Sequence, residues 1–138
     1  MSNKVLLINA RIVNGNGIFE GSLLIENGRI AKLMQSSEEV PKSVKIIDCS
    51  GKYLLPGVID DQVHFREPGL THKADIYTES RAAVAGGVTS FMEMPNTEPK
   101  TLTEALLEEK YAIASKNSLA NYSFYMGVSN DNAGEALR

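Results

Sequence analysis

The segment at residues 57–69, GVIDDQVHFREPG, joins an apolar run to a group of polar side chains. Because side chains alternate between the two faces of a strand, it predicts one polar face and one apolar face. The two faces hold Asp60, Gln62 and His64 on one side, and Ile59, Val63 and Phe65 on the other. In an α/β barrel the apolar face would contact the helices and the polar face would line the lumen. Catalytic groups of such barrels lie at the carboxyl ends of strands, where this polar set lies.

After Pro56 the sequence alternates between strand and helix patterns. The predicted elements are strands at 57–65, 88–94 and 121–129 and helices at 71–87 and 101–116. The second helix would begin with a capping box formed by Thr101 and Glu104. This order implies parallel strands joined by right-handed crossovers. Because three parallel strands alone leave an exposed sheet edge, we interpret residues 55–138 as the first three strands and two helices of a (β/α)8 TIM-type barrel.

Residues 1–54 have a different pattern, in which short strands are separated by turn signals. The predicted strands are Val5–Ile8, Arg11–Val13, Ser22–Glu26, Arg29–Met34 and 44–49. Asn27 and Gly28 lie between two apolar runs and predict a hairpin, because both central residues of a type I′ turn need positive φ. We expect a small antiparallel β-sandwich, incomplete by itself. The predicted fold class is therefore α/β, with this sandwich preceding the N-terminal part of the barrel.

Composition and charge exclude several kinds of partner. Lys+Arg 14 against Asp+Glu 17 gives a net charge of -3, so there is no electrostatic reason to expect nucleic acid or an anionic membrane. No stretch approaches the roughly 20 apolar residues of a membrane span. The single cysteine, Cys49, has no partner for an internal disulfide, which favours a reducing, cytoplasmic location.

Three polar residues near the predicted strand ends are candidates for chemistry. His64 is either a metal ligand or a hydrogen-bonded structural histidine. Arg66 is either a clamp for a planar carboxylate, through two parallel hydrogen bonds, or a solvated loop charge. Their closeness in sequence favours the functional interpretation of both. Asn96 follows the second predicted strand and would project toward the same edge, with an Asx-turn as the alternative.

The motifs at residues 56–69 and 85–97, PGVIDDQVHFREPG and AGGVTSFMEMPNT, resemble the amidohydrolase superfamily and, within it, the class I dihydroorotases. HFREPG and MPNT are the discriminating pieces, because related hydantoinases, dihydropyrimidinases and allantoinases share the barrel and the metal motif but usually lack that Arg and the PNT. Residues 6–33 are similar to the start of the small β domain in these enzymes. The resemblance therefore spans essentially the whole chain.

The resemblance implies a substrate site and a metal site. In these enzymes the Arg after the metal motif and the Asn of PNT hold the substrate carboxylate, which assigns substrate binding to Arg66 and Asn96. The metal motif is Asp-x-His-x-His, with one or two Zn²⁺ ions as the implied cofactor. Asp60 matches its Asp and His64 its second His, whereas Gln62 stands at the first His position.

Gln62 leaves the metal site open to three interpretations, since zinc is bound almost entirely by Cys, His, Asp and Glu. Gln62 ligates through its carbonyl oxygen, or Asp61 swings in as a substitute ligand through a β-bulge. Otherwise the first metal position is weak or empty, and a second metal or His64 alone serves. Asp61 has the parity of the apolar face, so a bulge or exposure at the strand end is expected.

The implied activity is metal-dependent, reversible hydrolysis of the cyclic amide of (S)-dihydroorotate to N-carbamoyl-L-aspartate, in pyrimidine biosynthesis. The remaining ligands and a general-base Asp lie on later strands in this family, so residues 1–138 alone are expected to show no turnover. The alternatives are another cyclic amidohydrolase, such as a hydantoinase or allantoinase, or an inactive dihydroorotase-like assembly subunit. The implied partners are the small-molecule substrate, further copies of the chain, and aspartate carbamoyltransferase.

Overall fold

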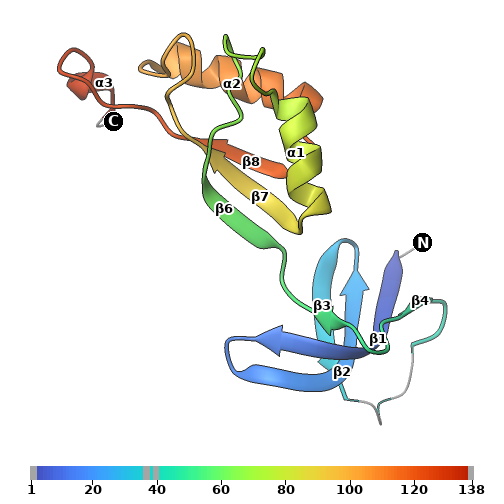
Figure 1. Cartoon of the computed structure of the whole chain (residues 1–138). Coiled ribbons are helices and arrows are strands. Elements are labelled where there is room, and N and C mark those ends of the chain that lie inside the picture. Colours follow the sequence, from blue (N-terminus) through green and yellow to red (C-terminus); the bar gives the residue numbers. More distant parts are fainter. Residues whose placement is uncertain (1–2, 36–37, 39–40, 137–138) are drawn as a thin grey trace. The chain divides into compact units, whose positions relative to one another are not determined.

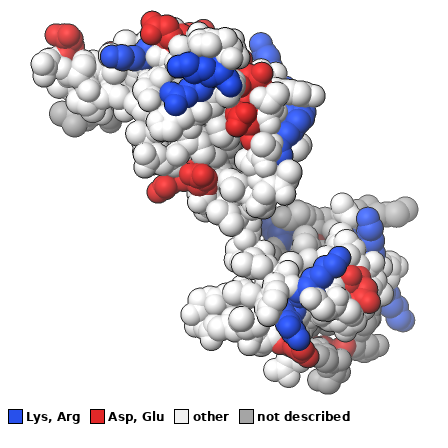
Figure 2. Space-filling model, viewed as in Figure 1, with Lys and Arg blue, Asp and Glu red and all other residues white. Residues whose placement is uncertain are grey.

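A computed structural model describes residues 3–35, 38 and 41–136 of the chain (Figure 1). The chain divides into two compact units, Met1–Pro56 and Gly57–Arg138. The boundary predicted from the sequence lies two residues earlier, after Leu54. Within the described residues, no helix is both long and apolar enough to cross a membrane. Positive and negative side chains are interspersed on the face of the molecule seen in Figure 2.

The first unit is a five-stranded sheet with the order β3-β2-β1-β4, in which β5 also pairs with β1. Its strands are β1 (Lys4–Asn14), β2 (Gly17–Glu26), β3 (Arg29–Met34), β4 (Lys45–Asp48) and β5 (Tyr53–Leu54). The hairpin predicted between β2 and β3 is confirmed, since Asn27 and Gly28 have φ values of 52° and 76°. The two strands predicted within residues 5–13 are one strand, whose register with β2 shifts near Asn9 (φ 57°).

This sheet corrects the expectation of a purely antiparallel sandwich. β4 and β5 both run parallel to β1, and the described strands of the unit form one sheet instead of two facing sheets. The physical reason is the length of the connection after β3. Ten residues separate β3 from β4, which is too many for a tight hairpin, so β4 is not constrained to pair antiparallel with β3.

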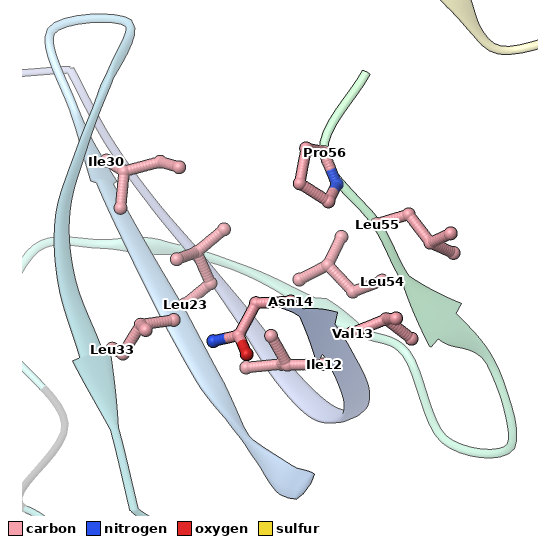
Figure 3. Close-up of a pocket in the computed structure, with 9 residues that line it drawn as sticks. All are labelled: Ile12, Val13, Asn14, Leu23, Ile30, Leu33, Leu54, Leu55 and Pro56. Atoms are coloured by element: carbon pink, nitrogen blue, oxygen red, sulfur yellow. The ribbon is translucent and has the colours of Figure 1, made fainter. Parts of the chain in front are cut away.

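An apolar pocket of about 160 Å³ lies in the first unit (Figure 3). Several of its lining side chains are well exposed, including Ile30, Leu33 and Leu55. Asn14 is the only residue of the lining with a polar side chain. All the site residues predicted from the sequence belong to the second unit, so this pocket is not where the predicted chemistry lies.

The second unit has a parallel three-stranded sheet in the order β6-β7-β8, as predicted. Its elements are β6 (Val58–Val63), α1 (Ile76–Ala85), β7 (Val88–Glu93), α2 (Glu104–Asn117), β8 (Asn121–Phe124) and α3 (Ala133–Ala136). Figure 1 shows α1 and α2 beside these strands. The core contains three phenylalanines, Phe65, Phe91 and Phe124, packed with Ile76 of α1 and Ala114 of α2. The sheet and helices are therefore joined by one apolar cluster.

Both helices begin later than the sequence patterns predict. α1 starts at Ile76 because the Asp75 side chain accepts a 2.7 Å hydrogen bond from the Thr78 N–H, which makes Asp75 the N-cap. α2 is capped by Thr103 instead of Thr101. Thr101 is 1% exposed and its hydroxyl lies 3.3 Å from that of Thr97, so it packs the preceding loop.

We expect Asp75→Ala to speed amide hydrogen exchange in the first turn of α1, whereas Asp75→Asn, which also caps, should not. Hydrogen bonds from the backbone N–H and hydroxyl of Thr78 lower the pKa of Asp75 from its ordinary value. The cap is therefore complete above the unfolded pKa of about 3.9, and it weakens as pH falls through the lower folded value. Amide exchange has an intrinsic dependence on pH. Beyond that dependence, the protection of these amides should change with pH in this range only when residue 75 is Asp. Equal profiles for Asp75 and Asp75→Asn would contradict the assignment.

Candidate functional site

The end of β6 contains a β-bulge. Asp60 pairs with Phe91 and Val63 with Glu93, so β6 has one more residue than β7 between these two pairs. Asp61 lies within the bulge and is exposed, as are Asp60 and Gln62. The bulge accounts for a charged residue at a position where simple alternation predicts an apolar one. After it, Val63 and Phe65 enter the core, and His64 between them is exposed.

The structure places His64 and Asn96 in contact, although 31 residues of sequence separate them. The Nδ1 atom of His64 lies 3.0 Å from Oδ1 of Asn96. An amide oxygen only accepts hydrogen bonds, so Nδ1 is the donor in this contact, and in the neutral imidazole this tautomer has its lone pair on Nε2. Within the described part of the chain, the Asn96 amide nitrogen has no acceptor, so it remains able to donate.

Arg66 has an unusual backbone conformation and an unpaired charge. Its φ of 71° is in the left-handed region, which residues with a Cβ seldom adopt. Its backbone N–H donates a 2.8 Å hydrogen bond to Oε1 of Glu93. The guanidinium forms no ion pair with any carboxylate in residues 3–35, 38 and 41–136. The residue is half-buried.

Glu93 and Lys110 form an ion pair that is almost completely removed from solvent. Their side chains are 1% and 0% exposed, and Lys110 Nζ lies 3.0 Å from Glu93 Oε2. Burial raises the pKa of Glu93, while the charge of Lys110 opposes that rise. Burial likewise lowers the pKa of Lys110, opposed by Glu93. The pair links the last residue of β7 to α2.

The loops after β6 and β7 are in direct contact. The N–H of Glu98 donates a 3.2 Å hydrogen bond to the carbonyl of Pro68. Gly69 has a φ of 81°, and a Cβ at this position would overlap the carbonyl oxygen of Glu98. The loop that carries Arg66 and the loop that carries Asn96 are therefore held together by a backbone approach that only glycine permits.

The described residues do not make a complete metal site. Among them, no three His, Cys, Asp or Glu side chains gather in a group that could hold a metal ion. His64 offers one imidazole nitrogen, and Gln62 offers only a neutral amide. His72 is exposed in the turns before α1.

The proteins that this chain resembles are named dihydroorotases, allantoinases and hydantoinases, which are cyclic amidohydrolases. The dihydro-orotase-like family matches residues 51–138. The chain therefore belongs to the dihydro-orotase-like family.

Two relatives of this chain are named as different enzymes. A dihydroorotase of Methanosarcina acetivorans is 41% identical over 120 residues, which cover 87% of this chain and 26% of that protein. An allantoinase of Desulfitobacterium hafniense is 36% identical over 130 residues, covering 93% and 28% respectively. The chain thus spans about a quarter of the length of these relatives.

Solved structures agree with the fold. The L-hydantoinase (dihydropyrimidinase) of Arthrobacter aurescens matches with a TM-score of 0.89 and 32% identity, covering 98% of this chain and 30% of that one. The dihydropyrimidinase of Brevibacillus agri matches with a TM-score of 0.82 and 25% identity, covering 95% and 28%.

Sequence reasoning missed Glu93 and Lys110. A signal for each was present in the sequence. Glu93 has the same strand parity as Phe91, and Lys110 lies on the helix face of Leu107 and Ala114. A charged residue at a core position on each of two adjacent elements predicts a buried pair.

We expect Gly69→Ala to destabilise the protein and to reduce ligand binding at the polar cluster of His64, Arg66 and Asn96. A left-handed alanine costs of order 1–3 kcal/mol, and the overlap with Glu98 adds to this. Chemical denaturation measures the first effect. Gly134→Ala is the control, since a Cβ there meets nothing within 4 Å. A Gly69 variant as stable as the Gly134 variant would show that the two loops do not approach as described.

Proposed function

We propose that the protein containing this chain is a dihydroorotase, which reversibly hydrolyses the cyclic amide of (S)-dihydroorotate to N-carbamoyl-L-aspartate in pyrimidine biosynthesis. Family membership and the dihydroorotases among its relatives support this proposal. The observation that carries it is the guanidinium of Arg66, two residues after His64, which pairs with no carboxylate of the described residues, together with the contact between Asn96 and that histidine. A substrate with a carboxylate beside its reacting ring suits this arrangement.

Each of the three residues has a proposed role. Arg66 binds the substrate carboxylate through two parallel hydrogen bonds, because a planar guanidinium matches a planar carboxylate. Asn96 donates from its free amide nitrogen to the same carboxylate. Holding the carboxylate fixes the ring relative to the reacting groups, which is how binding energy at a remote group accelerates a reaction.

The proposal includes one or two Zn²⁺ ions in the whole protein. Nε2 of His64 has the lone pair that a metal requires, and its partner Asn96 fixes that tautomer. The other ligands and the general-base Asp must come from outside residues 1–138, so we propose no step through the metal for this chain. Gln62 and Asp61 remain candidate ligands of the first metal position.

The whole protein would have the architecture and setting that the family resemblance implies. We propose a complete (β/α)8 barrel that continues from β8, with residues 1–54 as part of a small β domain. We further propose a cytoplasmic homo-oligomer that assembles with aspartate carbamoyltransferase. Residues 1–138 alone should have no turnover.

Two other functions have specific support. The allantoinases among the relatives and the L-hydantoinase structure favour a different cyclic amide as substrate. Gln62, at a position where the family has a histidine, favours an inactive assembly subunit. Assays of the full-length protein on dihydroorotate, hydantoin and allantoin separate the three. We expect turnover of dihydroorotate, and turnover of only hydantoin or allantoin would contradict the proposal, as would none at all.

Replacing Arg66 with Ala in the full-length protein should raise KM for dihydroorotate by roughly 10–100-fold, with a smaller effect on kcat. A pair of charge-assisted hydrogen bonds contributes about 1.5–3 kcal/mol, and each 1.4 kcal/mol is tenfold. Steady-state kinetics measure the change. Arg81→Ala is the control, because that guanidinium lies 3.5 Å from the Tyr77 ring on α1. Equal KM values for the two variants would refute the carboxylate role of Arg66.

Replacing Gln62 with His should increase the zinc bound per full-length protein, since it restores a nitrogen ligand at the first metal position. Elemental analysis after equilibration with limiting zinc measures the change. Gln62→Ala and Asp61→Asn distinguish the three interpretations: loss of metal in only one of them identifies the ligand, and no loss in either indicates a weak or empty position. Unchanged zinc in Gln62→His would mean that residue 62 does not face a metal.

A further inference from the structure

We propose that Glu93 and Lys110 are positioning residues for the carboxylate site, and that their buried ion pair holds the backbone turn from which the Arg66 side chain projects. The inference rests on the proposed function, since it assumes that Arg66 binds the substrate carboxylate. It concerns residues that lie behind the site and do not themselves contact a ligand.

The backbone of Arg66 is strained. A left-handed φ of 71° is unfavourable for a residue with a side chain, so it persists only where surrounding contacts impose it. The 2.8 Å hydrogen bond from the Arg66 N–H to Glu93 Oε1 is such a contact. The Glu93 carboxylate therefore holds the backbone amide at the strained residue itself.

Lys110 contacts both the carboxylate of Glu93 and the backbone that follows β7. Its Nζ lies 3.0 Å from Glu93 Oε2 and 3.2 Å from the carbonyl oxygen of Met94. It also lies 4.9 Å from the centre of the Phe124 ring. Lys110 therefore fixes the carboxylate and, at the same time, the backbone from which the Asn96 loop begins. The positions of both proposed carboxylate-binding residues, Arg66 and Asn96, therefore depend on the ammonium group of Lys110.

The presence of a charged pair at this buried position needs a reason other than stability. Apolar residues of similar volume often replace a buried ion pair with no loss of stability, so stability alone does not account for it. An apolar pair offers no acceptor to the amide of Arg66. The oxygen of residue 93 is the part of the pair that an apolar substitution cannot reproduce, and this distinguishes positioning from packing.

Two double variants of the full-length protein isolate that oxygen. Glu93→Gln with Lys110→Met removes both charges and keeps an amide oxygen to accept from Arg66. Glu93→Met with Lys110→Met also removes both charges and leaves no acceptor. Side-chain volumes are similar in the two variants, so their comparison tests the hydrogen bond at constant charge and packing.

We expect the Gln/Met variant to keep KM for dihydroorotate within about threefold of the unmodified protein. The Met/Met variant should raise KM at least tenfold, change kcat less, and weaken binding of N-carbamoyl-L-aspartate to the same extent in calorimetry. Combining Met/Met with Arg66→Ala should add no further loss, because the effect passes through Arg66. Equal KM values for the two double variants would overturn the inference, and so would additive losses with Arg66→Ala.

The outcomes separate this inference from the proposed function. If Arg66→Ala leaves KM unchanged, the carboxylate role itself fails. If Arg66→Ala raises KM and the Met/Met variant does not, only the inference fails. Should the Met/Met variant not fold, amide hydrogen exchange in the unmodified protein decides the matter. The amide of Arg66 should then exchange as slowly as those of the β7 core, and rapid exchange would overturn the inference.

Discussion

A carboxylate buried at the end of β7 is the constraint on which the second unit depends. Glu93 is 1% exposed, and removal of a charged group from water is costly unless charges and donors of the protein compensate it. The ammonium of Lys110 on α2 lies 3.0 Å from Oε2, which accepts no well-aligned hydrogen bond among the described residues, and the backbone N–H of Arg66 donates to Oε1. Three elements distant in the sequence are thereby fixed at one point. The polar cluster of His64, Arg66 and Asn96 lies beside that point.

Much of the fold followed from local patterns. The hairpin at Asn27 and Gly28 was predictable because its backbone conformation needs these residue types. The parallel order of β6, β7 and β8 followed from the alternation of strand and helix. The direction of β4 did not, since parallel pairing with β1 depends on the path of a long connection. The start of α2 was also missed, because Thr101 and Thr103 are equally good caps and only packing of Thr101 decides between them.

The candidate site was predictable where its residues follow strand ends in sequence motifs and hidden where they face the core. His64, Arg66 and Asn96 stand in motifs at strand ends, and strand direction brings them to one edge. Glu93 and Lys110 each resemble a solvated charge when considered alone, and only their core-facing positions on two successive elements, taken together, indicate the pair. The position of the bulge at Asp61 was also hidden, because the alternation of polar and apolar residues does not show where an extra residue enters the strand.

The central claim is that Arg66 and Asn96 jointly bind a carboxylate beside His64, on a turn held by Glu93. A crystal structure of the full-length protein with N-carbamoyl-L-aspartate tests it most directly. The account predicts ligand carboxylate oxygens about 2.7–2.9 Å from two nitrogens of the Arg66 guanidinium, with the Asn96 amide nitrogen also in contact. The Arg66 N–H should still be bonded to Glu93. A carboxylate bound elsewhere, with Arg66 facing solvent, would contradict the account.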